Sequence, residues 1–226
     1  MEIAPNVHAV RMLASYAFLV AEERLTLIDA GLPGSRRRLD AYLASIGRSM
    51  EELDRILCTH RHPDHIGGVR ELVSASGAEV LMHPADTAAL RVTFREAVAS
   101  RSPGPLVAYL TRGPEDAGPI VDGQMLPELG GLQVIHTPGH TSGSVCFWAP
   151  AHRLLFTGDV LQVTRGRLAF ASLVFSDDHP QAQASVARLA ELDVRTIAFS
   201  HYPPWRDRTA EALRALARTA VSAEGI

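Results

Sequence analysis

Three histidines and one aspartate lie within six consecutive positions of this 226-residue chain. The stretch "THRHPDHIGG" (59 to 68) contains His60, His62, Asp64 and His65. Neutral imidazole and carboxylate groups are the natural protein ligands of zinc and neighbouring transition metals. His60 and His62 are separated by one residue, so in an extended loop their side chains point the same way. Asp64 and His65 then fall on the other side.

Three further candidate ligands follow segments that we interpret as strands. His140 lies in "TPGHTSGS", Asp159 ends "FTGD", and His201 lies in "FSHYPP". Because these side chains leave the ends of separate strands, we expect all seven to meet at one site. One tetrahedral ion needs three protein ligands and a water, whereas seven ligands suit two ions that share a carboxylate. The alternatives are that Asp159 is a turn or helix-cap residue and that His201 is a core or interface histidine.

Two ions about 3.5–4 Å apart form a known arrangement for hydrolysis. We expect a hydroxide bridging the ions to be the nucleophile, because zinc lowers the pKa of bound water to about 7. Asp64 and Asp159 would orient this hydroxide and accept its proton. Gly67 and Gly68 would remove side-chain bulk where the backbone passes close to the site. No serine or cysteine nucleophile is needed.

Short apolar runs alternate with helical patterns along both halves of the chain. Helical spacing and terminal glycines predict helices at 35–47, 66–77, 179–192 and 208–220. This alternation favours an α/β fold with a sheet-on-sheet core and helices outside. No linker-like stretch divides the chain, so we expect one domain, residues 1–226. The expected strands are two or three within 7–30, and one each at 53–60, 78–84, 131–140, 143–150, 152–160 and 194–204.

Residues 85–119 depart from this pattern, because "RSPGP" and "RGPEDAGP" interrupt their helical patches. We interpret them as a lid-like surface insertion or an oligomer contact. The two cysteines, Cys58 and Cys146, form no CxxC pair and are interpreted as reduced thiols packed on strands. We therefore expect a cytoplasmic protein, with a homodimer as one possible assembly.

Composition and charge narrow the class of partner. The formal net charge of −3 and the scattered arginines argue against a nucleic-acid groove or an anionic membrane surface. No segment approaches the roughly 20 apolar residues of a membrane span. We therefore expect a small-molecule substrate, with no nucleic-acid or membrane partner.

The sequence resembles the metallo-β-lactamase superfamily in five motif blocks that occur in the same order. "HRHPDH" matches the HxHxDH motif of that family, His140, Asp159 and His201 follow it, and "LIDAG" around Asp29 matches a recurrent acidic turn. The resemblance covers nearly the whole chain. It implies an αββα sandwich in which two mixed sheets pack face to face, with helices outside and metals at the edge where the sheets meet.

The resemblance also implies two divalent metal ions per chain, with zinc expected and iron or manganese as alternatives. Asp29 would support the ligand loops, or would be a simple turn residue. Many relatives carry a "GHG"-like motif at the last ligand, whereas this chain has "SHYPP", so Tyr202 is a candidate pocket residue. The implied ligands are His60, His62 and His140 for the first ion, Asp64, His65 and His201 for the second, and Asp159 as the bridge.

A small carboxylic ester, thioester or lactone is the expected substrate, as in the glyoxalase II-like and lactonase-like branch. Nucleases gain affinity by neutralising phosphates, and this chain offers no basic surface for that purpose. The chain ends soon after its last predicted helix, so we expect no C-terminal helical domain of the kind with which glyoxalase II relatives hold glutathione. Residues 85–119 and 161–175 would wall the pocket, and Arg165 and Arg167 are candidates for holding an anionic group.

Three other functions remain open. Sulfur dioxygenases with the same motif use a single iron held by two His and one Asp, which here would be His60, His140 and Asp159. A phosphodiesterase of the same fold is the second alternative, and a binding protein with a degenerate site is the third. One iron per chain together with oxygen uptake would exclude the hydrolase.

Overall fold

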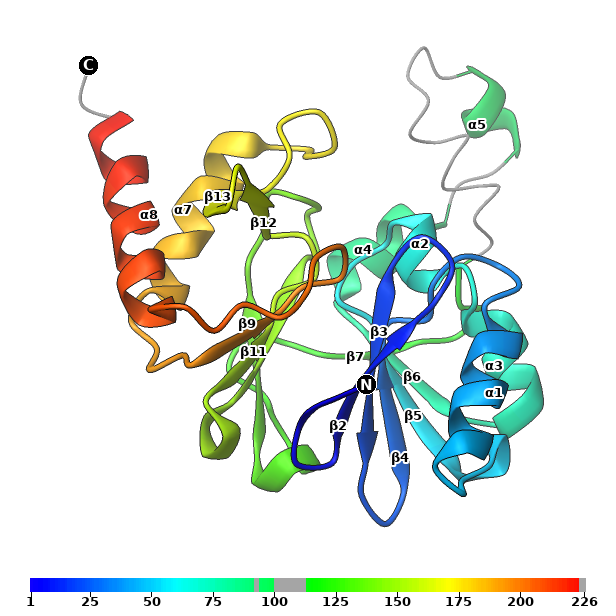
Figure 1. Cartoon of the computed structure of the whole chain (residues 1–226). Helices are drawn as coiled ribbons and strands as arrows, with labels where there is room; N and C mark the ends of the chain where they lie inside the picture. The colour runs from blue at the N-terminus through cyan, green and yellow to red at the C-terminus, as the bar shows by residue number, and fades with distance from the viewer. Residues whose placement is uncertain (92–93, 100–112, 224–226) are drawn as a thin grey trace. The chain divides into compact units, whose positions relative to one another are not determined.

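The computed structural model describes residues 1–91, 94–99 and 113–223. The chain divides into two compact units, Met1–Ile120 and Val121–Ile226, which we call the first and second unit. Each unit has its own sheet and its own covering helices (Figure 1). The expectation of a single domain stays a prediction.

The first unit is built on a seven-stranded sheet with its strands in sequence order. Neighbours from β1 to β4 run antiparallel, and neighbours from β4 to β7 run parallel. The carboxyl ends of β4, β5 and β6 therefore lie at one edge of the sheet, where ligand-bearing loops of α/β proteins gather. The strands are β1 (Glu2–Ala4), β2 (Val7–Arg11), β3 (Tyr16–Ala21), β4 (Leu25–Ile28), β5 (Leu53–Leu57), β6 (Glu79–Met82) and β7 (Gly118–Pro119).

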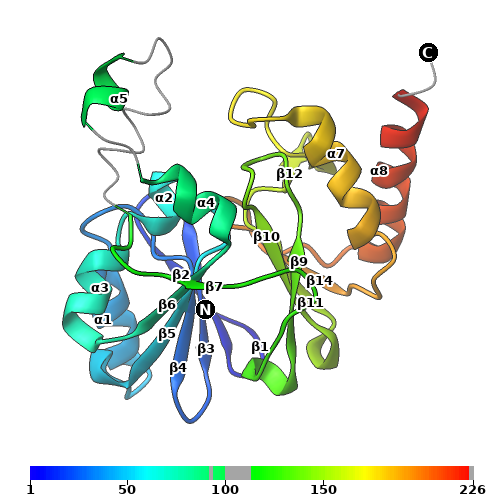
Figure 2. The ribbon, with the colours of Figure 1, turned by 180° about the vertical axis from the view of Figure 1, so that it is seen from behind.

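Helices α1 and α3 cover one face of this sheet, as Figures 1 and 2 show from opposite sides. Leu39 and Leu43 of α1 and Leu72 of α3 share a buried apolar cluster with strand residues such as Leu27 and Ile56. This burial of one apolar stripe per helix is what the predicted 3.6-residue spacing requires. The helices are α1 (Arg36–Ser45), α2 (Pro63–Ile66), α3 (Val69–Ser76), α4 (Pro84–Ala89) and α5 (Phe94–Ala99), with a 3₁₀ turn at Met50–Glu52.

The second unit contains a five-stranded sheet in the order β14-β11-β10-β9-β8 and a two-stranded hairpin, β12-β13. Strand β10 is antiparallel to both β9 and β11, and β11 is parallel to β14. Strands β9, β11 and β14 consequently point the same way, and their carboxyl ends share one edge. The strands are β8 (Met125–Leu126), β9 (Leu132–His136), β10 (Val145–Ala149), β11 (Leu154–Phe156), β12 (Leu161–Thr164), β13 (Arg167–Phe170) and β14 (Thr196–Ala198).

Helices α7 (His179–Leu189) and α8 (Thr209–Ala223) pack against this second sheet (Figure 2). Their buried residues Val186, Leu189 and Leu213 share a cluster with Trp148 and Leu155 of the strands. Two 3₁₀ turns, Glu128–Gly130 and Pro150–His152, complete the regular structure of this unit. Among the described residues, no helix is both long enough and apolar enough to span a membrane.

Most of the expected strands and helices are present, with the differences concentrated where loops were expected. The segment 161–175, expected as a pocket wall and given no secondary structure from the sequence, contains the hairpin β12-β13. Its two turn residues, Arg165 and Gly166, both have positive φ (51° and 72°), as a type I′ hairpin turn requires. An Arg-Gly pair is a weak turn signal, so the sequence did not predict this hairpin.

The predicted insertion at 85–119 falls partly on residues 92–93 and 100–112, which lie outside the described residues. Its two ends are integral parts of the first unit. Helix α4 begins at Pro84 and buries Asp86 completely, and strand β7 pairs with β6. The role of the segment as a lid or a contact stays a prediction.

Candidate metal centre

The histidine-rich stretch of the first unit leaves strand β5 as an extended loop and enters helix α2. His62 occupies the position before the helix, with an extended backbone (φ −65°, ψ 148°), and Pro63 is the first helical residue. Proline suits that position because its missing N–H would have no helical partner there. Asp64 and His65 consequently fall in the first helical turn, and His60 lies before the bend.

His60 and His62 form the first close pair of candidate ligands. Nε2 of His60 lies 3.1 Å from Nδ1 of His62, and the two ring planes are nearly perpendicular at 83°. Two nitrogens bound to one tetrahedral zinc at about 2.0–2.1 Å would lie about 3.3 Å apart. The pair is thus spaced as neighbouring ligands of one ion. Their predicted orientation toward the same side agrees with this geometry.

Asp29 organises the ligands of this loop from below. It is completely buried, and its backbone has a positive φ of 63°, a conformation that few residues other than glycine adopt. The backbone N–H of Thr59 donates to Oδ1 of Asp29 at 2.8 Å, and the Thr59 hydroxyl donates to Oδ2 at 2.8 Å. Nδ1 of His65 lies 2.8 Å from the same Oδ2. Asp29 therefore contacts the loop that carries the candidate ligands, and its role in supporting metal ligands stays a prediction.

These contacts fix which ring nitrogen each histidine presents. The Thr59 hydroxyl gives its proton to Asp29, so it accepts from Nδ1 of His60 at 3.0 Å. Nε2 of His60 is then the nitrogen with the lone pair. Likewise, Nδ1 of His65 faces Asp29, and its Nε2 lies 3.7 Å from Oδ2 of Asp64. The predicted pairs His60–His62 and Asp64–His65 are therefore both found within the first unit.

A carboxylate that the sequence did not single out holds the backbone between the first two histidines. Asp86, in the first turn of α4, is completely buried. Its Oδ2 accepts the backbone N–H of Arg61 at 2.8 Å, and its Oδ1 accepts Nη1 of Arg61 at 3.0 Å. Arg61 is the residue between His60 and His62, so Asp86 fixes the spacing of these two ligands through the main chain.

We expect Asp86→Asn to weaken metal binding at His60 and His62 by about 10–100-fold, the usual cost of losing a group that orients a metal ligand. An asparagine keeps one acceptor but turns an NH₂ group toward one of the two Arg61 donors. The measurement is the zinc dissociation constant by competition with a chromogenic chelator. Asp54→Asn is the matched control, because Asp54 forms an exposed pair with Arg24 in the same unit. An unchanged constant with intact circular dichroism would contradict the role of Asp86.

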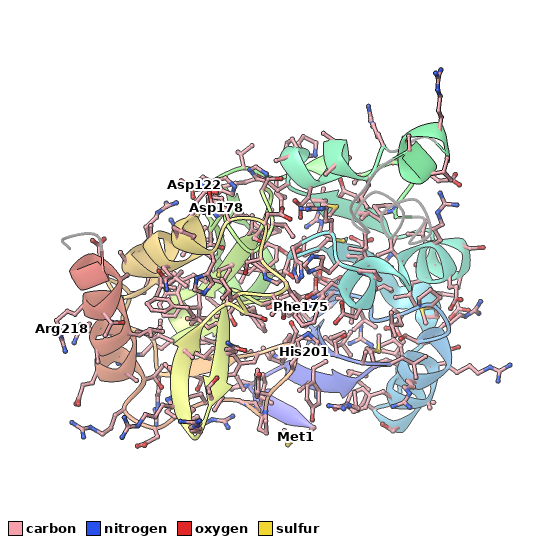
Figure 3. The ribbon with its side chains drawn as sticks, turned by 90° about the horizontal axis from the view of Figure 1, so that it is seen from above. Met1, Asp122, Phe175, Asp178, His201 and Arg218 are labelled. Carbon is pink, nitrogen blue, oxygen red and sulfur yellow. The ribbon has the colours of Figure 1, made fainter. Side chains whose placement is uncertain are left out.

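The second unit brings together the three remaining candidate ligands. His140, Asp159 and His201 follow β9, β11 and β14, the three strands whose carboxyl ends share an edge. Oδ2 of Asp159 lies 3.7 Å from Nε2 of His140 and 3.2 Å from Nε2 of His201. One carboxylate oxygen thus faces both imidazoles. His140 is almost completely buried, whereas the side chain of His201, labelled in Figure 3, is 32% exposed.

The loop that carries His140 is held against the start of helix α7. Gly139 has a φ of 127°, and a Cβ at this position would lie 2.0 Å from the backbone nitrogen of Ala182. Only glycine permits this approach. Asp178 caps α7 and donates its backbone N–H to the carbonyl of Gly139 at 2.8 Å, and the Ser185 hydroxyl donates to the carbonyl of Pro138 at 2.8 Å. The helix therefore sets the position of His140.

Ser176 is a second residue that the sequence did not single out. Its hydroxyl donates to the carbonyl of Ser172 at 2.6 Å, so its oxygen accepts from Nδ1 of His140 at 3.4 Å, a long hydrogen bond. This arrangement leaves the lone pair on Nε2, the nitrogen that faces Asp159. Ser176 thus has the same relation to His140 that Thr59 has to His60.

Several sequence expectations acquire a different physical basis. A Cβ on Gly67 would lie 2.5 Å from Pro33, and one on Gly68 would lie 2.4 Å from the carbonyl oxygen of Ala30. These glycines therefore allow the loop after β4 to pack closely against the backbone here. Tyr202 is partly buried and packs against the apolar cluster of the second unit, edge-on to Phe199 with the ring centroids 5.9 Å apart. Arg165 and Arg167, the other two predicted substrate contacts, are exposed at the turn of the hairpin β12-β13.

The two cysteines are free and completely buried. Burial raises the pKa of the Cys58 thiol well above its ordinary value, with smaller contributions from the carboxylates of Asp29 and Asp86. Burial likewise raises the pKa of Cys146 to about 12. Because the thiolate is the nucleophile and the metal ligand, neither sulfur competes with the histidines. This agrees with the prediction of packed, reduced thiols.

The family model of the metallo-beta-lactamase superfamily matches residues 10–201. The chain belongs to the metallo-beta-lactamase superfamily. Among its curated relatives is a hydroxyacylglutathione hydrolase of Pseudomonas aeruginosa, 33% identical over 179 residues. The alignment covers 78% of this chain and 55% of the relative, so the chain spans about half the length of that protein.

Solved structures share this fold. The metallo-beta-lactamase family protein TTHA1429 of Thermus thermophilus superposes with a TM-score of 0.77 and 21% identity, over 98% of this chain and 81% of that one. TTHA1623, solved in a di-iron-bound form, has a TM-score of 0.67 and 29% identity, over 94% and 97% of the two chains. The predicted fold class, two mixed sheets with covering helices, is confirmed. The predicted enzyme class, a metallo-hydrolase of this superfamily, agrees with the membership.

Proposed function

We propose that this superfamily member is a dinuclear metal-dependent hydrolase of small thioesters, with esters and lactones as related substrates. The proposal depends on one observation in the second unit: a single oxygen atom of the Asp159 carboxylate, Oδ2, faces two imidazole nitrogens. The loop of the first unit supplies two further ligand pairs. We propose that the two ligand sets together hold a pair of divalent ions, with Asp159 shared between them.

The residues present suit such ions. The His60 and His62 nitrogens are 3.1 Å apart, as two ligands of one tetrahedral ion would be. The imidazoles favour zinc or iron over calcium or magnesium, and the carboxylates also suit manganese. Zinc is the first expectation, and the di-iron form of TTHA1623 supports iron as the alternative. The implied assignment of His60, His62 and His140 to one ion and of Asp64, His65 and His201 to the other belongs to this proposal.

When bound, two divalent ions supply a Lewis acid and a water of lowered pKa at neutral pH. The chain's own carboxylates would then orient this water and accept its proton. The carboxylate of Asp64, 25% exposed, and that of Asp159, 19% exposed, are the acceptors that solvent reaches. Thr59, Asp29 and Ser176 hold the imidazole rings in the tautomers described above.

Thioesters come first among the substrates because several curated relatives are hydroxyacylglutathione hydrolases. The identity of 33% over about half of such a relative supports thioester hydrolysis as the reaction class. It does not identify the thiol part of the substrate. Thioester hydrolysis also needs no residue beyond the proposed ligands. Cytoplasmic location and a homodimer stay predictions.

The test is a substrate screen on protein freed of metal with a chelator and reconstituted separately with zinc, manganese or ferrous iron. We expect metal-dependent release of thiol from simple thioesters, measured with a chromogenic disulfide. The rate should rise between about pH 6 and pH 8, as bound water ionises. The metal-free protein serves as the control for spontaneous hydrolysis.

Two outcomes would overturn the proposal. Oxygen uptake with one iron per chain and no thiol release would identify a sulfur dioxygenase. Tight binding of two ions without cleavage of any thioester, ester or lactone, while a phosphodiester is cleaved, would move the reaction to phosphorus.

A further inference from the structure

Three consecutive apolar side chains of the second unit are exposed to solvent just before helix α7. Leu173 is 70% exposed, Val174 83% and Phe175 69%, the highest values among the large apolar residues of the described chain. We call residues 172–176 the apolar loop. A run of large apolar side chains in water commonly marks a binding site. Single exposed residues such as Met125 need no such explanation.

The apolar loop is held at its base by hydrogen bonds to the segment that carries His140. The Ser176 hydroxyl donates to the carbonyl of Ser172 at 2.6 Å, which closes the loop on itself. The same oxygen lies 3.4 Å from Nδ1 of His140, and the backbone N–H of Asp177 donates to the carbonyl of His140 at 3.1 Å. Phe175 is therefore one residue from a contact with a proposed metal ligand.

The C-terminal side of the loop is also fixed. Nε2 of His179 lies 3.2 Å from the carbonyl oxygen of Ala171. This contact joins the start of α7 to the residue before the loop. Asp178 caps the same helix. In Figure 3, Phe175 lies on the same side of the second unit as His201, whereas Arg218 of α8 lies on the opposite side. The apolar tip is thus exposed although its base is tied to residues beside the ligands.

We propose that the apolar loop binds the acyl group of the substrate, so that the enzyme prefers thioesters and esters with extended apolar acyl chains. This inference rests on the proposed hydrolase function. The carbonyl that reacts must sit beside His140, and its acyl chain must leave that point in some direction. Leu173, Val174 and Phe175 offer a water-exposed apolar surface that directly precedes Ser176, the residue whose hydroxyl contacts that ligand. Binding an acyl chain would remove both apolar surfaces from water.

The experiment compares a series of N-acetylcysteamine thioesters that differ only in the acyl group: acetyl, butyryl, hexanoyl and octanoyl. The variant is Leu173→Ser/Val174→Ser/Phe175→Ser in the full chain. We expect kcat/KM for the octanoyl ester to fall by about 10–100-fold, because the three substitutions remove several methylene contacts that each have a modest effect. Most of this change should be in KM. The acetyl ester should change by less than about twofold.

The matched control is Val121→Ser/Met125→Ser, which removes two apolar side chains of the same unit that are 52% and 57% exposed outside the loop. It should leave the whole series unchanged. Metal content and circular dichroism of both variants establish that ligands and fold are retained.

The outcomes separate the inference from the function it rests on. If the wild-type protein cleaves none of the esters, the proposed function fails. If it cleaves them but the triple variant keeps the wild-type dependence on chain length, or loses activity equally for all esters, the acyl-binding role is wrong. A triple variant that changes only its sedimentation coefficient would show that the loop joins copies of the chain.

Discussion

His62→Ala is expected to remove metal binding at the first ion and to lower the rate of hydrolysis by about three orders of magnitude or more. The estimate follows from the change that zinc makes to water, whose pKa falls from 15.7 to about 7 when it is bound. His62 contributes one nitrogen of the pair that is spaced 3.1 Å apart. It lies outside the buried clusters, so the free energy of unfolding of the metal-free protein should change little.

Two measurements check this expectation. Elemental analysis of the purified variant should show a loss of about one ion per chain, and thermal unfolding after chelation should match that of the chelated wild type. His152→Ala is the control, because His152 lies in a 3₁₀ turn of the second unit that carries no proposed ligand. Wild-type turnover by His62→Ala would refute the ligand assignment.

Asp159→Asn is expected to reduce the occupancy of both ions at once. Oδ2 of Asp159 faces Nε2 of His140 at 3.7 Å and Nε2 of His201 at 3.2 Å. A neutral amide keeps an acceptor but removes the negative charge that would be shared by two cations. Because the proposal also gives Asp159 a proton-accepting role, activity should fall even at metal concentrations that restore binding.

The test is titration of the metal-free variant with cobalt, followed by its absorption spectrum, beside calorimetric titration with zinc. Asp193→Asn is the matched control, because Asp193 forms an exposed ion pair with Arg153 in the same unit. Loss of a single ion, with the other bound as tightly as in the wild type, would mean that Asp159 does not bridge.

The ligand candidates could be named from the sequence because their signal is local, and their role as ligands stays a prediction. The types and spacing of His60, His62, Asp64 and His65 indicate metal chemistry before any fold is known, and each of the other three ends a recognisable strand. The apolar runs and terminal glycines likewise predicted most elements. Gly77, with a φ of 73°, ends α3 where the pattern placed its end.

The groups that position the ligands could not be predicted in the same way. Asp86 acts on Arg61 across 25 residues of sequence, and Ser176 acts on His140 across 36. A lone aspartate in "HPADT" reads as a helix-start residue, and a lone serine in "VFSDD" reads as a loop residue. Only tertiary contacts give either one a partner. Asp29 was identified through its resemblance to a family turn, and its contacts with Thr59 and His65 supply the physical reason.

The buried, protonated thiol of Cys58 affects how this protein should react with thiol-alkylating reagents. The thiol lies directly between strand β5 and Thr59, yet it is inaccessible and disfavours ionisation. Alkylating reagents therefore need the first unit to open before they can react. Alkylation located at Cys58 would therefore report how often that unit opens and would carry no information about the chemical step.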